Sequence, residues 1–325
     1  MAQPNSLYNE LASVTINEMS DEAADSVIQH NAALRMISES GNVKTVSGGV
    51  LITETIRFAQ NVNGGSFSGY DILPTAAADE LTLATYSLKQ YAVPVVFSSL
   101  EQAQNSGKQQ IIDLVEERVE IAQDTMKNLL NQDIYGDGTS NNGKVLTGLG
   151  AAVVYNGTNV YGGIDRSVST NAFWKNQSYQ ATADGGGVAT SSTIQSQWNT
   201  FIKSMTFGPQ RPNVILCDSN VHGIFEGSLQ AIQRITDADS ASAGFLTVEY
   251  KGIPVIFDTT ASNIPANTAY FLNTKFLKWR PHKDFNMISL DDKQSLNQAA
   301  TVKTLVWYGN MTTSGSRYQG IYVNE

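Results

Sequence analysis

Residues 111–139 read IIDLVEERVEIAQDTMKNLLNQDIYGDGT, and this stretch carries the strongest local structural signal in the chain. Its apolar residues recur every three or four positions, which places their side chains on one face of an α-helix. This apolar stripe consists of Ile111, Val115, Val119, Ala122, Met126 and Leu129. We therefore predict a helix of roughly 25 residues, which ends at the turn 135–139 because that turn contains two glycines.

The residues before this helix show the periodicity of β-strands. Apolar residues alternate through 50–58 and again through 81–97, and the segment 61–69 between them is rich in Gly, Asn and Ser. Two alternating runs around such a segment predict a long β-hairpin. An isolated two-stranded ribbon is only marginally stable in water, so the hairpin implies a partner surface.

The first 47 residues are polar and show only weak helical patterning. A stretch without a clear apolar stripe cannot bury enough surface to fold alone. We therefore expect an extended arm with short helices that needs a neighbour to lie on.

The residues after the long helix alternate between short helices and short strands. Residues 140–190 are rich in loops, and 192–207 repeat the helical spacing of apolar residues. The further predicted elements are strands at 214–216, 245–250, 255–257, 269–272, 302–308 and 319–323, with a short helix at 221–232. One long helix with several antiparallel strands predicts the α+β class.

Composition restricts the function classes that are compatible with the chain. Its 325 residues carry a net charge of −9, and only 16% of them are charged, against roughly 25% in an average globular protein. Such a low charge content suggests that other chains cover much of the surface. The acidic balance disfavours proteins that clamp the nucleic-acid backbone.

Targeting signals and disulfide bonds are also not expected. A single cysteine, Cys217, excludes a disulfide within one chain. No apolar run reaches the roughly 18 residues of a membrane span. The N-terminus does not have the pattern of a signal peptide, so we expect a reducing cytoplasm as the site of synthesis.

Two glycine-containing stretches could bind a ligand, but the sequence of each favours a structural role. The Gly148-Leu149-Gly150 segment matches only the start of a dinucleotide fingerprint and lacks its third glycine. Asp133, Asp137 and Asn141 do not follow the order of a calcium-binding EF-hand loop. We therefore interpret both stretches as turns.

The pair Asp218 and His222 offers too few ligands for a metal ion. Cys217 lies on an apolar strand, which favours a buried side chain over a nucleophile. We predict no catalytic residue, no cofactor and no metal site, and therefore no enzymatic activity.

The order of the predicted parts resembles the major capsid protein of tailed bacteriophages, which has the Hong Kong 97-type fold. The segment 133–139, followed by Leu146-Thr147-Gly148-Leu149, is similar to the end of the spine helix in that family. The segment Lys251-Gly252-Ile253-Pro254-Val255-Ile256 resembles the strand of its axial domain. The strand 214–217 with Asp218 and a following helix fits the strand before it.

The resemblance implies a domain map. Residues 1–49 would form the N-terminal arm and 50–97 the extended-loop hairpin. Residues 98–190 and 299–325 would form the peripheral domain with the spine helix. Residues 191–298 would form the axial α/β domain.

The resemblance also implies a function, which is assembly. The chain would form pentamers and hexamers of the icosahedral head that encloses the double-stranded DNA genome of a tailed phage. Its location would be the virion, after assembly in the cytoplasm of the bacterial host. The hairpin would lie across a neighbouring subunit, with contacts expected at Asn63, Gly64, Gly65, Phe67 and Tyr70.

The expected partners follow from the same resemblance. They are further copies of the chain, a separate scaffolding protein, a portal, a possible decoration protein and packaged DNA in non-specific contact, with no membrane. Some family members cross-link a lysine of the extended loop to a neighbour, but no lysine occurs between Lys44 and Lys89 here. Covalent cross-linking is therefore not expected.

Two alternatives remain open at the level of the sequence. An encapsulin, the shell of a cellular nanocompartment, has the same fold and encloses an enzyme in place of DNA. A cytoplasmic α+β enzyme would need a cluster of acid, base or nucleophile, and the sequence shows none.

Overall fold

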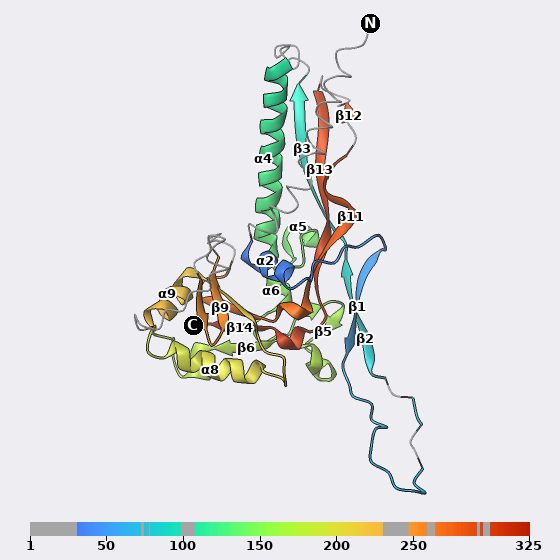
Figure 1. Cartoon of the computed structure of the whole chain (residues 1–325), viewed down its shortest axis with the longest axis vertical. Helices are drawn as coiled ribbons and strands as arrows, with labels where there is room; N and C mark the ends of the chain where they lie inside the picture. Colours follow the sequence, from blue (N-terminus) through green and yellow to red (C-terminus); the bar gives the residue numbers. More distant parts are fainter. Residues whose placement is uncertain are drawn as a thin grey trace.

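The computed structural model describes residues 31–72, 75–77, 79–98, 108–229, 247–258, 264–290, 293–294 and 300–325. A long helix and long strands extend toward one end of the molecule, a mixed region lies at one side of their base, and a hairpin projects from the opposite side (Figure 1). This mixture of helices with largely antiparallel sheets confirms the predicted α+β class.

The long helix α4 spans Lys108–Ile134 and has 27 residues. Its described side chains begin at residue 118, so the predicted stripe residues Ile111 and Val115 lie outside the described side chains. The buried positions recur every three or four residues: Val119, Ala122, Met126, Leu130 and Ile134. Leu129 was predicted in this stripe, but it is 39% exposed, because a period of 3.6 residues brings Leu130 to the core instead.

The helix ends where the turn was predicted. Gly136 donates its amide proton to the carbonyl of Asp133, and Gly138 adopts a φ of +78°, a conformation that favours glycine. The chain therefore leaves the helix axis directly after Ile134.

A four-stranded antiparallel sheet extends beside α4 (Figure 1). Its central strand is β13, Ala300–Thr313, which pairs along one edge with β3, Lys89–Ser98, and along the other with β11, Leu277–Ser289, and β12, Lys293–Gln294. Strand β11 was not predicted, because its residues do not alternate regularly in hydrophobicity and its pairing with β13 shifts between Pro281 and Asn286. The rings of Trp279 and Trp307 stack at 4.9 Å and join β11 to β13.

The second region is built on a six-stranded sheet of order β6-β14-β10-β7-β9-β8. These strands are β6 Gln177–Gln180, β14 Gly320–Val323, β10 Thr268–Leu272, β7 Val214–Cys217, β9 Ile253–Phe257 and β8 Thr247–Tyr250. The sheet therefore combines the C-terminal strand with strands from residues 177–272. The part of the predicted helix 221–232 after residue 229 lies outside the described residues, as do 245 and 246 of a predicted strand.

Both faces of this sheet are buried. Ile215 and Cys217 face the cluster formed with helices α8, Ile194–Met205, and α9, Ser219–Gly227, whereas Leu216 faces the core shared with α4. Trp198 of α8 stacks on Phe225 of α9 at 4.6 Å. The continuous apolar run of β7 is explained by this burial on both faces.

Helix α2, Ala32–Glu39, lies at the junction of the two regions (Figure 1). Asn31 caps it by accepting from the amides of Ala33 and Leu34, and most of its apolar side chains are buried. The following residues bond to β11, since the amide of Lys44 donates to Trp279 and that of Val46 to Pro281.

The position of α2 adds to the prediction for the first 47 residues. Their described part, from 31 on, contains one of the expected short helices, and the small apolar face of α2 packs into the core of its own chain. The rest of the predicted arm lies outside the described residues.

Short elements complete the fold. They are α5 Ser140–Gly143, α6 Leu149–Ala152, β4 Val160–Tyr161, β5 Ile164–Asp165, η1 Ser169–Trp174, α7 Ala181–Gly185, η2 Thr274–Phe276 and η3 Ser316–Tyr318.

Candidate assembly surfaces

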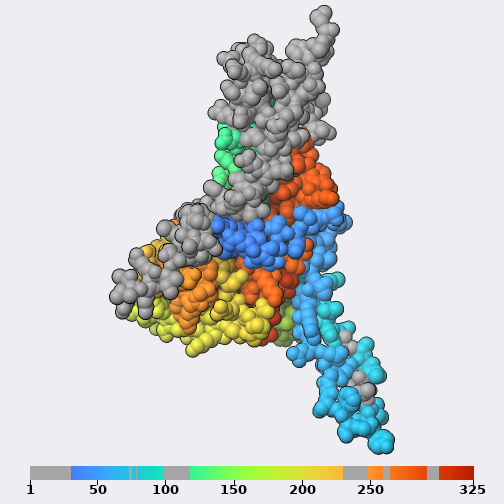
Figure 2. Space-filling model, viewed as in Figure 1, coloured from blue at the N-terminus to red at the C-terminus, as the bar shows by residue number. Residues whose placement is uncertain are grey.

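The predicted hairpin is present and consists of β1, Leu51–Arg57, and β2, Leu81–Ser87. The strands are antiparallel, and Leu51 pairs with Ser87. The loop between them, residues 58–80, projects away from the rest of the molecule (Figures 1 and 2). The second strand was predicted to continue to residue 97, but the hairpin ends at Ser87, because β3 pairs with β13.

The two faces of the hairpin have different environments. On the inner face Ile52, Ile56 and Tyr86 are buried against the body of the subunit. On the outer face Leu81 and Leu83 are 64% and 56% exposed. Exposed leucine side chains on a two-stranded ribbon make this face a candidate interface with another chain.

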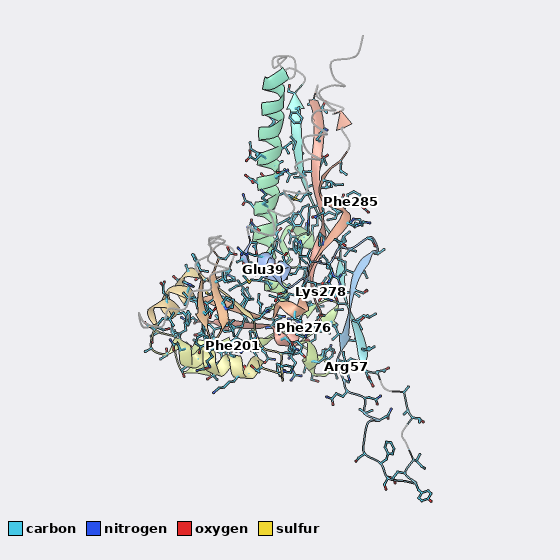
Figure 3. The ribbon with its side chains drawn as sticks, in the orientation of Figure 1. Glu39, Arg57, Phe201, Phe276, Lys278 and Phe285 are labelled. Carbon is cyan, nitrogen blue, oxygen red and sulfur yellow. The ribbon has the colours of Figure 1, made fainter. Side chains whose placement is uncertain are left out.

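Glu54 anchors the inner face to the body. Its carboxylate is buried and accepts hydrogen bonds from Nζ of Lys278 at 2.5 Å and from Nε of Arg280 at 3.1 Å, both on β11. The hydroxyl of Thr312 on β13 donates a further bond at 3.0 Å. Three strands distant in sequence therefore meet at one carboxylate, in the part of the molecule where Figure 3 labels Lys278.

The charges around Glu54 determine its ionisation. Burial by itself raises the pKa of this carboxyl, but the hydrogen bonds and positive charges of Lys278 and Arg280 outweigh burial, so the pKa lies below its ordinary value. Glu54 is thus held as an anion. The sequence contained a signal for this contact, because Glu54 lies at an inward-facing position of an alternating strand, where a carboxylate requires a cationic partner.

A second anchor joins β2 to the end of β13 and to the β4–β5 turn. The hydroxyl of Tyr86 donates to the carbonyl of Thr313 at 3.0 Å, and the amide of Thr85 donates to Gly162 at 2.9 Å. A Cβ on Gly162 would lie 2.9 Å from that of Ala84, so this close approach requires glycine. At the start of the loop, the ring of Phe58 contacts that of Phe173 at 5.2 Å.

A buried arginine holds this turn in place. The guanidinium of Arg166 donates to Asn176 at 3.0 Å, to the carbonyl of Ala152 at 2.8 Å and to the hydroxyl of Ser316 at 2.9 Å. It also lies 4.7 Å from the ring centre of Tyr161. Burial lowers the pKa of Arg166 to about 10, and the side chain fixes the support on which β2 rests.

The five residues expected at subunit contacts all lie in the projecting loop. Phe67 and Tyr70 are 65% and 104% exposed, and Gly64 and Gly65 are exposed as well. Asn63 is half-buried, and its side-chain amide donates to the carbonyl of Ala76 across the loop. The loop is thus organised by its own hydrogen bonds, while its aromatic rings point into solvent.

The glycines of the incomplete dinucleotide motif have a packing role. A Cβ on Gly148 would lie 2.4 Å from the carbonyl oxygens of Asp133 and Ile134, and one on Gly150 would lie 2.7 Å from that of Tyr135. Close contact with the end of α4 explains why both positions lack side chains. The motif is therefore part of the packing around the spine helix.

The candidate carboxylates Asp133 and Asp218 have structural partners. Asp133 accepts from the hydroxyl of Tyr91 at 2.5 Å, and Asp218 caps α9 by accepting from the amide of Asn220. Burial raises the pKa of the Cys217 thiol and lowers that of His222. Among the described residues, no three His, Cys, Asp or Glu side chains gather where they could hold a metal ion.

None of the described helices combines the length and the hydropathy that crossing a bilayer demands.

Comparison with known proteins places this geometry in a fold family. No protein-family model matches the chain, and no curated protein matches it in sequence. The capsid asymmetric unit of cyanophage A-1(L) matches with a TM-score of 0.63 and 17% identity, over 89% of this chain and 92% of that chain. Mycobacterium phage Bobi matches with a TM-score of 0.53 and 14% identity, over 88% and 89%.

A cellular shell protein matches as well. The holo-SrpI encapsulin complex of Synechococcus elongatus PCC 7942 gives a TM-score of 0.53 with 9% identity, over 89% of each chain. Each of the three matches covers at least 88% of this chain and at least 89% of the other chain. The chain therefore has the Hong Kong 97-type capsid fold.

Proposed function

We propose that the chain is the major capsid protein of a tailed phage, which assembles into pentamers and hexamers of an icosahedral head around double-stranded DNA. The observation that carries this proposal is the hairpin, whose inner face is fixed by Glu54 and Tyr86 while its outer face and loop are uncovered by the described part of the chain. A projecting apolar ribbon acquires a buried environment when a second subunit lies against it. The role is structural and not enzymatic.

The domain map enters this proposal with three adjustments. The spine helix, β3, β11 and β13 would form the peripheral part, and the six-stranded sheet would form the axial part, which includes β6 and β14. The predicted boundaries assigned residues 177–190 and 320–323 to the peripheral domain, 277–289 to the axial domain and 89–97 to the hairpin. Scaffolding, portal and decoration proteins and non-specific contact with DNA complete the proposed set of partners, with the virion as the location after assembly in the host cytoplasm.

An encapsulin shell is the second candidate, because an encapsulin shares the fold. The phage assignment is favoured because the cyanophage capsid matches with a higher TM-score and a higher identity than the encapsulin complex. The two candidates differ in what their shells contain, which is DNA for one and an enzyme for the other.

Expression of the chain alone and with the neighbouring genes of its source tests the proposal. Negative-stain electron microscopy and light scattering of the soluble fraction should show closed shells, tubes or capsomer rings. Nuclease-protected DNA inside particles from the native source supports the phage head, whereas a protein cargo identifies an encapsulin. A monomer or dimer at several mg/ml under all these conditions contradicts both candidates.

A further inference from the structure

A cluster of stacked aromatic rings lies between the two sheets, near Phe276 in Figure 3. The ring of Phe276 stacks on that of Tyr318 at 4.2 Å, and Tyr318 meets Phe207 edge to face at 5.9 Å. All three side chains are half-buried, so part of each ring reaches solvent. We call these three residues the aromatic platform.

Exposed cations surround the aromatic platform. The guanidinium of Arg317 lies 4.0 Å from the ring centre of Phe207, and Nζ of Lys275 lies 5.8 Å from that of Phe276. Arg211 is exposed, and its main-chain carbonyl accepts from the side-chain amide of Asn273, so its backbone lies beside the segment that carries Lys275. We call these three residues together with the aromatic platform the basic patch.

The basic patch is unusual on a chain of net charge −9. The three sequence stretches that build it, 203–217, 259–283 and 300–324, contain no Asp or Glu. A concentration of one charge sign on a protein of the opposite overall sign is a mark of an interaction surface. The partner should therefore be acidic.

Contacts within the subunit hold the Phe276–Tyr318 stack of the aromatic platform in place. The carbonyl of Phe276 accepts from the hydroxyl of Thr313 at 3.0 Å and from the amide of Ser314 at 2.9 Å. A Cβ on Gly315 would lie 2.7 Å from the ring of Tyr318 and 2.9 Å from that of Phe276, so glycine permits this stack. A preorganised surface loses little side-chain entropy on binding.

The hairpin loop has the complementary chemistry. Residues 58–80 contain Asp71, Asp79 and Glu80 and no lysine or arginine. Phe67 and Tyr70 are exposed in the same loop. Among the described residues, the hydrogen bonds of 59–80 stay within the hairpin, and the loop projects away from the rest of the molecule (Figure 2).

We propose that the acidic, aromatic hairpin loop of one subunit docks on the basic patch of a second copy of this chain. This inference rests on the proposed shell function and names the surface that receives the loop. Carboxylates of the loop would meet Lys275, Arg317 and Arg211, and the loop's aromatic rings would pack on the platform. Duplex DNA is the less suitable occupant, because it offers phosphates to the cations but keeps its base faces stacked away from the aromatic rings.

Charge reversal tests the pairing. One double variant carries Lys275→Glu and Arg317→Glu, a second carries Asp79→Lys and Glu80→Lys, and a third combines all four changes. Assembly is measured by light scattering against protein concentration, with electron microscopy of the products. A control double variant, Lys44→Glu with Lys144→Glu, makes the same change in net charge as the patch variant, at exposed lysines outside the patch.

We expect each loop or patch reversal to raise the concentration needed for assembly by roughly tenfold or more, since like charges then face each other. The combined variant should recover most of the assembly, and the control should assemble like the unmodified chain. Urea unfolding of the unassembled subunits should give the same midpoint for all variants, which separates docking from folding.

Two results would overturn the inference while the shell function stands. In one, the unmodified chain forms shells and the reversals change nothing, or the combined variant shows no recovery. In the other, the patch variant assembles normally but its particles retain less DNA, which would make the patch a DNA contact. Failure of the unmodified chain to assemble under any condition is a different result, which removes the proposed function and the inference with it.

Discussion

The carboxylate of Glu54 on β1 lies 2.5 Å from the ammonium group of Lys278 on β11, so one ion pair joins the hairpin to a strand 224 positions later in the chain. Arg280 and Thr312 bond to the same carboxylate. The base of the hairpin is therefore fixed in direction, while the hydrogen bonds of the described loop residues 59–80 stay within the hairpin. In the proposed shell, such a base would set where the loop meets a neighbouring subunit.

Loss of the charge at Glu54 should loosen this base. Glu54→Gln leaves Lys278 and Arg280 without their carboxylate, and we expect a cost of about 2 kcal/mol, less than for a fully buried pair because both cations are partly exposed. The measurement is urea unfolding of the unassembled subunit, with hydrogen exchange of residues 51–57 as the local readout.

Glu39→Gln is the matched control for this variant. Glu39 pairs with Arg35 one helical turn away on the surface, so its neutralisation should cost less than about 0.5 kcal/mol. Equal losses for the two variants would contradict an anchoring role for Glu54.

The Glu54 anchor should also depend on pH. Because the pKa of Glu54 in the folded subunit lies below its ordinary value of 4.5, the stabilisation is complete above that value and is lost as the pH falls below it. The stability of the unmodified subunit should thus decline between about pH 5 and pH 3 by more than that of Glu54→Gln. Urea midpoints across this range measure the difference, and parallel curves would show that Glu54 does not contribute.

Two adjacent leucines test the rotational position of α4. Leu130→Ala should cost about 2 to 4 kcal/mol because Leu130 is fully buried, whereas Leu129→Ala should cost less than about 1 kcal/mol. Thermal and urea unfolding of the two variants under the same conditions measures both values. The reverse order would mean that the helix presents the originally predicted stripe.

The contact between Gly148 and the end of α4 should not tolerate a side chain. Gly148→Ala places a methyl group 2.4 Å from two carbonyl oxygens, and we expect a loss of about 2 to 4 kcal/mol as the backbone shifts. Gly223→Ala is the control, because its Cβ meets nothing within 4 Å on helix α9, and the change should be neutral or stabilising. Circular dichroism during urea unfolding compares them, and a neutral Gly148→Ala would refute the packing role.

Deletion of the loop should separate folding from assembly. Removal of residues 61–70 leaves both anchors of the hairpin base intact, so the unassembled subunit should unfold at an unchanged urea concentration. The assembled shells should melt at a lower temperature because contacts between subunits are lost. Calorimetry of the particles measures this, and an unchanged melting temperature would exclude the loop from subunit contacts.

Local patterns were sufficient for the elements whose stability depends on nearby residues. The apolar repeat of α4, the glycines that end it and the alternation of β1 are all encoded within a few turns of chain, because a helix or hairpin brings together residues close in sequence. The error at Leu129 is small and local, since one residue rotates a helix by about 100° and the stripe had two adjacent leucines to choose from.

The sequence by itself determined the α+β class, the long helix, the hairpin and the absence of a recognisable catalytic motif. Only the tertiary structure decided that β3 pairs with β13 and not with β1, and that α2 packs on its own chain. It also decided that Glu54 bonds to Lys278 and Arg280, and that Lys275 and Arg317 lie beside the aromatic platform. Several of these contacts join segments that are more than 200 positions apart in the sequence. Which distant segments come into contact depends on how whole sheets pack together. The hydrophobic periodicity of a single segment does not contain this information.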